Sequence, residues 1–412
     1  MAVLFTNISW LVNVREQYCL LRGKDLADLP IIAHAYLVVE GEVITDFGPM
    51  EDLKYPPEHF QEHYDLKGRC VLPAWCDSHT HLVFAGSREG EFVDKIKGLS
   101  YADIAAKGGG ILNSARKLNE ATEDELFHQS YARLQEVMRM GTGAIEIKSG
   151  YGLTVEGELK MLRVIKRLKS VSKVPIKATF LGAHTTPFEY KKNKEGYIAL
   201  IIEEMLPVIG KERLADYIDV FCEQGFFTPE ETERICIAGK QYSLKPKIHA
   251  NQLSVSGGVQ VGVKVGAVSV DHLESMDEAS IQTLSRSSTI GTLLPSAAFF
   301  LRMGYQPART LIDCNCAIAL ASDYNPGSSP SGNMNFVVAL SCIQMRLLPA
   351  EAINAATING AFAMELQDEV GSITKGKRAN LIVTKSVPSV DYLPYSFAHN
   401  LIDKVMISGS WV

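Results

Sequence analysis

The feature that most limits the fold is a series of eight short apolar segments in the middle of the chain, separated by helical patterns. Continuous apolar runs of this length, rich in β-branched residues, are typical of strands buried on both faces of a parallel sheet. The predicted strands are Val71–Trp75, Gly143–Ile147, Pro175–Phe180, Tyr217–Phe221, Pro246–Ile248, Ala267–Val270, Thr289–Leu294 and Ala317–Ala321.

Amphipathic helices fill the gaps between these strands. In Leu159–Ser170 the apolar residues fall on one face and most of the basic residues on the other, as in a crossover helix packed on a sheet. This alternation over residues 70–369 predicts an α/β fold of the (β/α)8 TIM barrel type. An open doubly wound sheet alternates in the same way, but it needs a phosphate-binding loop or a similar device. The run Gly108-Gly109-Gly110 follows no predicted strand and lacks the dinucleotide-binding spacing.

The two ends of the chain are rich in short strands and tight turns. Leu37-Val38-Val39 and Val43-Ile44 flank a glycine turn, which is a β-hairpin signal, and the tail after Val370 repeats the pattern. Chain termini often lie close together. We therefore expect residues 1–69 and 370–412 to form one small composite β-sandwich domain beside the barrel.

Composition narrows the range of partners and compartments. The net charge of −6 is dispersed, without the basic runs that indicate nucleic-acid or anionic-membrane binding. The sequence contains no apolar run of the roughly 18 residues that cross a bilayer, and Met1–Trp10 lacks the pattern of a signal peptide. The eight cysteines are scattered without a CxxC pair, which favours reduced thiols and a cytoplasmic protein.

The sharpest local signal is Asp77-Ser78-His79-Thr80-His81, directly after the first predicted strand. Side chains two residues apart in a strand point the same way, so His79 and His81 can present two imidazoles to one metal ion. Imidazole suits zinc, iron and related metals. By itself the pair is a weak signal, because two histidines with local hydrogen bonds would give the same pattern.

Other ionisable residues end later strands. His184, His249 and His272 follow the third, fifth and sixth predicted strands, and Asp323 follows the eighth. In a barrel these carboxyl ends converge on one rim, where active sites form. Burying so many ionisable groups without a function is costly. The sequence therefore indicates an active site at this rim, with a metal ion as its candidate centre.

These residues match the pattern of the amidohydrolase superfamily, and further motifs resemble one family within it, the imidazolonepropionases. The resemblance extends over nearly the whole chain. The motifs that carry it are Asp77–His81, Phe84-Ala85-Gly86-Ser87-Arg88, Lys148–Gly152, Thr179–His184, Val270–Glu274 and Ser322–Ser328.

The resemblance implies a metal-dependent hydrolase of histidine degradation. Such enzymes open the ring of 4-imidazolone-5-propanoate with a metal-activated water, giving N-formimino-L-glutamate. One zinc or iron ion is expected, the substrate is a small molecule with a carboxylate, and a homodimer is common among similar enzymes. The implied metal ligands are His79, His81, His249 and Asp323. The implied substrate contacts are Arg88, Tyr101, Tyr151, His184, Gln252, Asn325, Gly327 and Ser328.

The implied catalytic residues are His272, Asp323 and His184. His272, with an ordinary pKa near about 6.5, is expected to take a proton from the attacking water and pass it to the leaving nitrogen. Asp323 can share this role. His184 is a candidate donor to the oxyanion that develops in the reaction. The Arg88 guanidinium can form a bidentate interaction with a substrate carboxylate, and its alternative role is a surface salt bridge.

Several choices stay open on the residues alone. Either Asn251 or Gln252 could orient the water or the substrate ring, and Glu223 after the fourth strand has no assigned role. Lys148 could form the carbamylated bridge of a binuclear site, although the substrate loop that follows it favours a single metal. A nucleobase or triazine deaminase of the same superfamily is the alternative function. A metal-free scaffold is disfavoured because every ligand position is filled.

Overall fold

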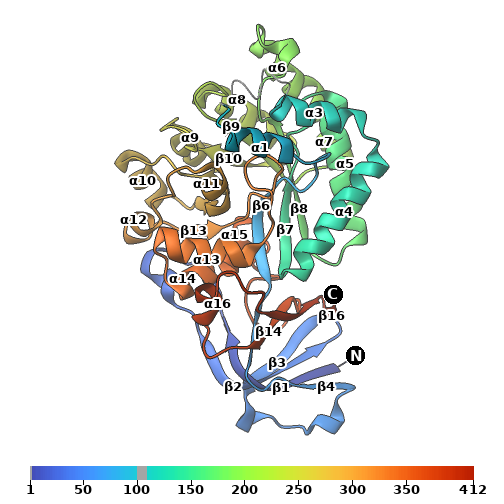
Figure 1. Cartoon of the computed structure of the whole chain (residues 1–412), viewed down its shortest axis with the longest axis vertical. Coiled ribbons are helices and arrows are strands. Elements are labelled where there is room, and N and C mark those ends of the chain that lie inside the picture. The colour runs from blue at the N-terminus through green and yellow to red at the C-terminus, as the bar shows by residue number, and fades with distance from the viewer. Residues whose placement is uncertain (1, 100–108) are drawn as a thin grey trace.

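The computed structural model describes residues 2–99 and 109–412, and within these the chain forms two sheets (Figure 1). Over the described residues, the larger unit is a parallel sheet of eight strands in the order β13-β12-β11-β10-β9-β8-β7-β6. Its strands are β6 Trp75–Thr80, β7 Thr142–Lys148, β8 Ile176–Ala183, β9 Tyr217–Cys222, β10 Lys245–Ala250, β11 Ser269–His272, β12 Ile290–Leu293 and β13 Ile318–Leu320. A bridge between Thr80 and Tyr324 links β6 to the segment after β13, so the sheet closes into the predicted barrel.

Helices alternate with these strands and lie around the barrel (Figure 1). They are α1 Glu89–Ile96, α3 Ile111–Glu120, α4 Glu123–Arg139, α5 Val155–Val171, α6 Lys194–Leu200, α7 Leu206–Glu212, α8 Pro229–Lys240, α9 Gly258–Lys264, α10 Glu278–Ser285, α11 Pro295–Leu301, α12 Ala308–Asp313, α13 Met334–Met345, α14 Pro349–Ala356 and α15 Ile358–Ala363. A further short helix, α16 Tyr392–Tyr395, belongs to the C-terminal segment and packs against α13. The predicted amphipathic segment Leu159–Ser170 lies within α5, with its apolar residues buried against the barrel core. Among the described helices, none is long and apolar enough to cross a membrane.

The second sheet joins the two ends of the chain. Its strands pair in the order β16-β15-β14-β5-β1-β2-β3, with β4 on β1. They are β1 Ala2–Val12, β2 Ile31–Glu40, β3 Val43–Pro49, β4 Glu62–Asp65, β5 Arg69–Pro73, β14 Leu381–Ser386, β15 Ile402–Ile407 and β16 Ser410–Trp411. Trp411 at one end of this order packs against Phe5 and Tyr64, so the sheet curls over its own apolar core. The predicted fold class is confirmed, while the division of the chain at residues 69 and 370 stays a prediction.

The prediction that Val71–Trp75 is the first barrel strand is wrong. Most of this run is β5, in the second sheet, and the first barrel strand is β6, which contains His79. The residues of β6 are largely polar and buried, and several of their polar groups have partners; Ser322, for example, donates from its backbone N–H and its hydroxyl to the Asp77 carboxylate. Because polar side chains of this strand are accommodated inside the barrel, it lacks the apolar signature of the others.

A glycine lets α15 lie close to the strand that carries His79. A Cβ added at Gly360 would come within 2.4 Å of the Cys76 carbonyl oxygen in β6. Overpacking of this kind costs about 1–3 kcal/mol, so Gly360→Ala should lower the free energy of unfolding in urea by that amount. Gly90→Ala in α1 is the matched control, because no described atom lies within 4 Å of its new Cβ and alanine favours a helix. An unchanged urea midpoint for Gly360→Ala would mean that α15 can move away from β6 without cost.

Candidate metal centre

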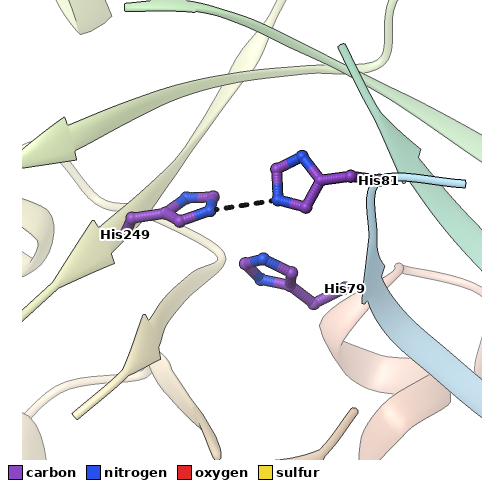
Figure 2. A group of neighbouring side chains, drawn as sticks. All are labelled: His79, His81 and His249. Carbon is purple, nitrogen blue, oxygen red and sulfur yellow. Dashed lines mark hydrogen bonds between the residues drawn. The ribbon is translucent and has the colours of Figure 1, made fainter. Parts of the chain in front are cut away.

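The structure brings the four predicted metal ligands together at the carboxyl ends of the barrel strands. His79 in β6, His81 just after it and His249 in β10 turn their rings toward one point (Figure 2). The Nε2 atoms of His81 and His249 are 3.4 Å apart. Asp323 follows β13 and brings its Oδ1 to 3.5 Å from His79 Nε2 and 3.7 Å from His81 Nε2. All four side chains are buried.

Buried carboxylates determine which nitrogen of each ring faces this point. The Nδ1 of His79 lies 2.7 Å from Asp271 Oδ2, and the Nδ1 of His249 lies 2.9 Å from Asp219 Oδ2. An ionised carboxylate only accepts hydrogen bonds, so the ring proton of each histidine resides on Nδ1. Each Nε2 then presents a lone pair to the centre, which is the arrangement found in histidines that bind metals.

This donor set fits a metal ion. His79 Nε2 is buried and has no hydrogen-bond partner among the described residues, although an orphaned buried acceptor is costly. Burial lowers the pKa of His79, His81 and His249 well below the ordinary value, so the rings are neutral and able to ligate. Burial also raises the pKa of Asp323 to about 6, and a neighbouring cation would favour its charged form. Three imidazoles and one carboxylate suit zinc or iron.

The predicted base, His272, lies beside this centre at the end of β11. Its Nδ1 is 3.4 Å from Glu274 Oε1, and that same oxygen accepts a hydrogen bond of 2.9 Å from the Gln306 side chain. Burial lowers the pKa of His272, but the carboxylates of Glu274, Asp323 and Asp271 together outweigh this effect and the net pKa is raised. The backbone φ of +87° at His272 and +68° at Leu273 turns the chain back toward the centre, a strained conformation that is common at functional sites.

A small cavity of about 60 Å³ lies next to the ligands and gathers most of the predicted substrate contacts. Its lining residues are His81, Tyr151, His184, Phe221, His249, Gln252, His272, Asp323, Asn325 and Ser328. Phe221, the last predicted residue of the fourth apolar run, had not been expected there. Tyr101, also predicted to touch substrate, lies outside the described residues.

Arg88 lies at the edge of this group, with its guanidinium against Tyr151 and Gly327. Its Nε donates to Ser114 Oγ at 2.8 Å, and its Cζ lies 5.8 Å from the centre of the Tyr151 ring. A Cβ at Gly327 would meet Arg88 Nη1 at 2.5 Å, so this glycine leaves room for the guanidinium. Arg88 Nη2 is buried and lacks a hydrogen-bond partner in the described part of the chain. A cationic donor is therefore available next to the cavity.

The turn after β13 supports the carboxylate ligand. Asn325 Oδ1 accepts hydrogen bonds of 2.8 Å from the backbone N–H groups of Gly327 and Ser328. The Asn325 amide nitrogen donates to the Asp323 carbonyl oxygen, and Ser328 Oγ lies 3.1 Å from Asp323 Oδ2. The turn predicted from Asn-Pro-Gly-Ser therefore holds Asp323 in addition to lining the cavity.

Glu158 organises the loop that carries Tyr151, and the sequence alone did not reveal it. Its carboxylate accepts hydrogen bonds from the backbone N–H groups of Gly150 at 3.0 Å, Gly152 at 2.7 Å and Leu153 at 2.9 Å. The side chain is fully buried within α5. The available signal was an acidic residue in the first turn of an amphipathic helix, on its apolar face.

Two residues left open by the sequence hold neighbouring loops. Glu223 accepts hydrogen bonds from the backbone N–H of Leu253 at 2.9 Å and from the Ser254 hydroxyl, so it holds the loop that begins with Gln252. The Asn251 amide nitrogen donates to the Ser275 carbonyl oxygen at 2.9 Å. Both contacts are structural, whereas Gln252 reaches the cavity.

The chain is similar to known proteins along nearly its whole length. A family model described as "Amidohydrolase family" matches residues 245–412. The chain is 57% identical to imidazolonepropionase of Flavobacterium johnsoniae, with 99% of each chain covered, and 53% identical to that of Christiangramia forsetii, with 100% of each covered. It is 42% identical to imidazolonepropionase of Clostridium tetani, over 95% of this chain and 93% of the other.

Solved structures share the fold at much lower identity. Escherichia coli guanine deaminase matches with a TM-score of 0.75 and 14% identity, over 100% of this chain and 99% of the other. A triazine hydrolase variant matches with a TM-score of 0.74 and 15% identity, over 100% and 94%. At this distance the likeness extends to the fold alone, and it gives no support to the alternative of a deaminase.

Replacement of Glu158 by glutamine should loosen the loop around Tyr151. The variant keeps the shape of the side chain but turns an amide donor toward backbone N–H groups, and an unsatisfied buried group costs about 1–3 kcal/mol. We expect a lower free energy of unfolding in urea and faster hydrogen exchange at Gly150, Gly152 and Leu153. Glu156→Gln, on the exposed face of the same helix, should change stability by less than about 0.5 kcal/mol. Equal exchange rates in the two variants would contradict this role of Glu158.

Proposed function

Because the chain belongs to the imidazolonepropionase family of the amidohydrolase superfamily, we propose that its buried histidine and aspartate side chains carry out that family's reaction. The reaction is hydrolysis of the ring of 4-imidazolone-5-propanoate to N-formimino-L-glutamate, a step in histidine degradation. The observation that carries the proposal is the convergence of His79, His81 and His249, with Asp323 beside two of these rings and the Nδ1 atoms of two rings held by carboxylates.

We propose that His79, His81, His249 and Asp323 hold one zinc or iron ion. Such an ion supplies a Lewis acid that lowers the pKa of a coordinated water from 15.7 to about 7. The surroundings of Lys148 support a single ion, since its Nζ lies 2.7 Å from Glu146 and 2.8 Å from Asp219. The three carboxylates near Lys148 raise its pKa more than burial lowers it, so the side chain is an ammonium and not the free amine that carbamylation requires.

The proton transfers are assigned to His272, with Asp323 sharing the role. The Glu274 carboxylate beside His272 Nδ1 fixes this ring and leaves Nε2 to take a proton from the attacking water. The same nitrogen then returns the proton to the leaving ring nitrogen. A positioned base of this kind contributes about 10²–10⁴-fold to the rate.

His184 is better suited to accept a hydrogen bond than to donate one. Its Nδ1 lies 2.9 Å from the Gly150 carbonyl oxygen, which can only accept, so Nδ1 carries the ring proton. Burial lowers the pKa of His184 to about 4, and the ring is therefore neutral with a lone pair on Nε2. We propose that this nitrogen binds an N–H of the substrate ring. The sequence-based role as oxyanion donor would require the protonated ring.

The substrate carboxylate is assigned to Arg88. Its Nη2, which has no hydrogen-bond partner among the described residues, supports this role. So does Tyr151, whose pKa is raised by burial so that its hydroxyl remains a donor. Gln252, Asn325, Gly327 and Ser328 complete the proposed substrate contacts. A homodimer and a cytoplasmic location stay predictions.

The proposed function is tested by adding imidazolonepropionate to the purified protein and following the decay of its ultraviolet absorbance. We expect turnover by protein that contains metal, loss of turnover after dialysis against a chelator, and recovery on adding zinc or iron. Metal analysis should give one ion per chain. The proposal would be wrong if metal-loaded protein left the absorbance unchanged.

Removal of the proposed carboxylate clamp should weaken substrate binding without affecting the metal. A hydrogen bond to a charged group contributes about 1.5–3 kcal/mol, so Arg88→Met should raise KM roughly 10- to 100-fold. Arg116→Met provides the control, because Arg116 is exposed on α3 and bonds only to Asn113 among the contacts described. Metal content should match the wild type in both variants. A KM for Arg88→Met close to that of Arg116→Met would rule out the clamp.

A further inference from the structure

Below the metal ligands, the barrel interior holds five charged side chains that are almost fully excluded from solvent. They are Glu146 and Lys148 in β7, Asp219 in β9, Lys247 in β10 and Asp271 in β11, each no more than 1% exposed. Two ammonium groups thus face three carboxylates in this cluster, which ion pairs link together. Buried charges are costly unless they are paired, so the pairing pattern shows what each one does.

Lys148 links the carboxylates that orient two different ligands. Its Nζ lies 2.8 Å from Asp219 Oδ2 and 3.4 Å from Asp271 Oδ2. These are the same two oxygen atoms that hold His249 Nδ1 at 2.9 Å and His79 Nδ1 at 2.7 Å. One ammonium therefore lies directly behind both histidine–aspartate pairs, although the two histidines come from strands far apart in the chain.

We infer that Lys148 is a positioning residue of the metal centre, whose ammonium holds Asp219 and Asp271 in the places that aim His249 and His79 at a common ion. The inference rests on the proposed metal site. It adds a lysine ammonium whose described ion pairs are with carboxylates behind the metal ligands. Without the ammonium, the two carboxylates would repel each other in a medium of low dielectric constant, and both rings would lose their fixed acceptors.

Lys247 offers a comparison inside the same cluster. It is as deeply buried as Lys148, and it also contacts Glu146. Its other contacts are the carbonyl oxygens of Ser78 and Ala363, each at 3.2 Å, and among the described ion pairs it has none with Asp219 or Asp271. Lys247 thus makes no described ion pair with either carboxylate, although its charge, like that of Lys148, lowers the pKa of Asp271.

Two double variants separate positioning from charge balance. Lys148→Met with Glu146→Gln and Lys247→Met with Glu146→Gln each remove one ammonium and one carboxylate, so they leave the same residual charge. Zinc affinity is measured for both and for the wild type by competition with a chromogenic chelator. Loss of an outer contact to a metal ligand typically weakens metal binding about 10- to 100-fold. We expect zinc affinity to fall by this factor only in the double variant Lys148→Met with Glu146→Gln. Nitrogen-15 spectra of the metal-free proteins should show mixed tautomers of His79 and His249 only in the double variant that lacks Lys148.

The outcomes are distinguishable. Equal loss of zinc affinity in both double variants, or no loss in either, would overturn the role of Lys148. Failure of the wild type to bind either zinc or iron would instead overturn the proposed metal site. If the double variant that lacks Lys148 does not fold, a crystal structure of the zinc-loaded wild type tests the inference instead. An ammonium within hydrogen-bond distance of both Asp219 and Asp271 supports the inference, and one turned toward Glu146 alone overturns it.

Discussion

Hydrogen bonds from imidazole Nδ1 atoms to buried carboxylates are the interaction on which this site depends. A neutral imidazole carries its proton on either nitrogen, and only a ring protonated at Nδ1 offers Nε2 as a ligand. Asp271 and Asp219 make that choice for His79 and His249. The barrel thus determines the position of each ligand and also its tautomer. This arrangement needs carboxylates in the interior, and both of these are paired with the buried ammonium of Lys148.

The barrel and the residues of its rim could be predicted because their signals are local. Apolar runs mark seven of the eight barrel strands over the described residues, since a parallel strand buried on both faces has no polar side. A histidine or aspartate at the end of such a run is visible against that background, as at His184 and Asp323. The exception is β6, whose residues are buried but largely polar, and there the sequence pattern indicated the preceding strand instead.

The supporting residues could not be found in the same way because their partners are remote in the chain. Asp219 lies 30 positions from His249, and Asp271 lies 192 positions from His79. Within its apolar strand, each aspartate has no neighbouring pattern that reveals a partner. Glu158 lies closer to the loop that it holds, but its role depends on three backbone N–H groups that turn inward together. Such contacts depend on closure of the barrel and not on short-range spacing.

The pairing of β5 with β14 has a consequence for the order in which the chain can fold during synthesis. Only Ala74 separates β5 from β6, the strand that carries His79, and β5 pairs along one edge with a strand that begins at Leu381. A chain leaving the ribosome from its N-terminus has all four proposed metal ligands outside the tunnel before this edge of β5 is covered. The pairing of β5 that anchors the start of β6 is therefore completed among the last steps of folding. A nascent chain that stalls late has its proposed ligands in place before β5 has gained this neighbouring strand.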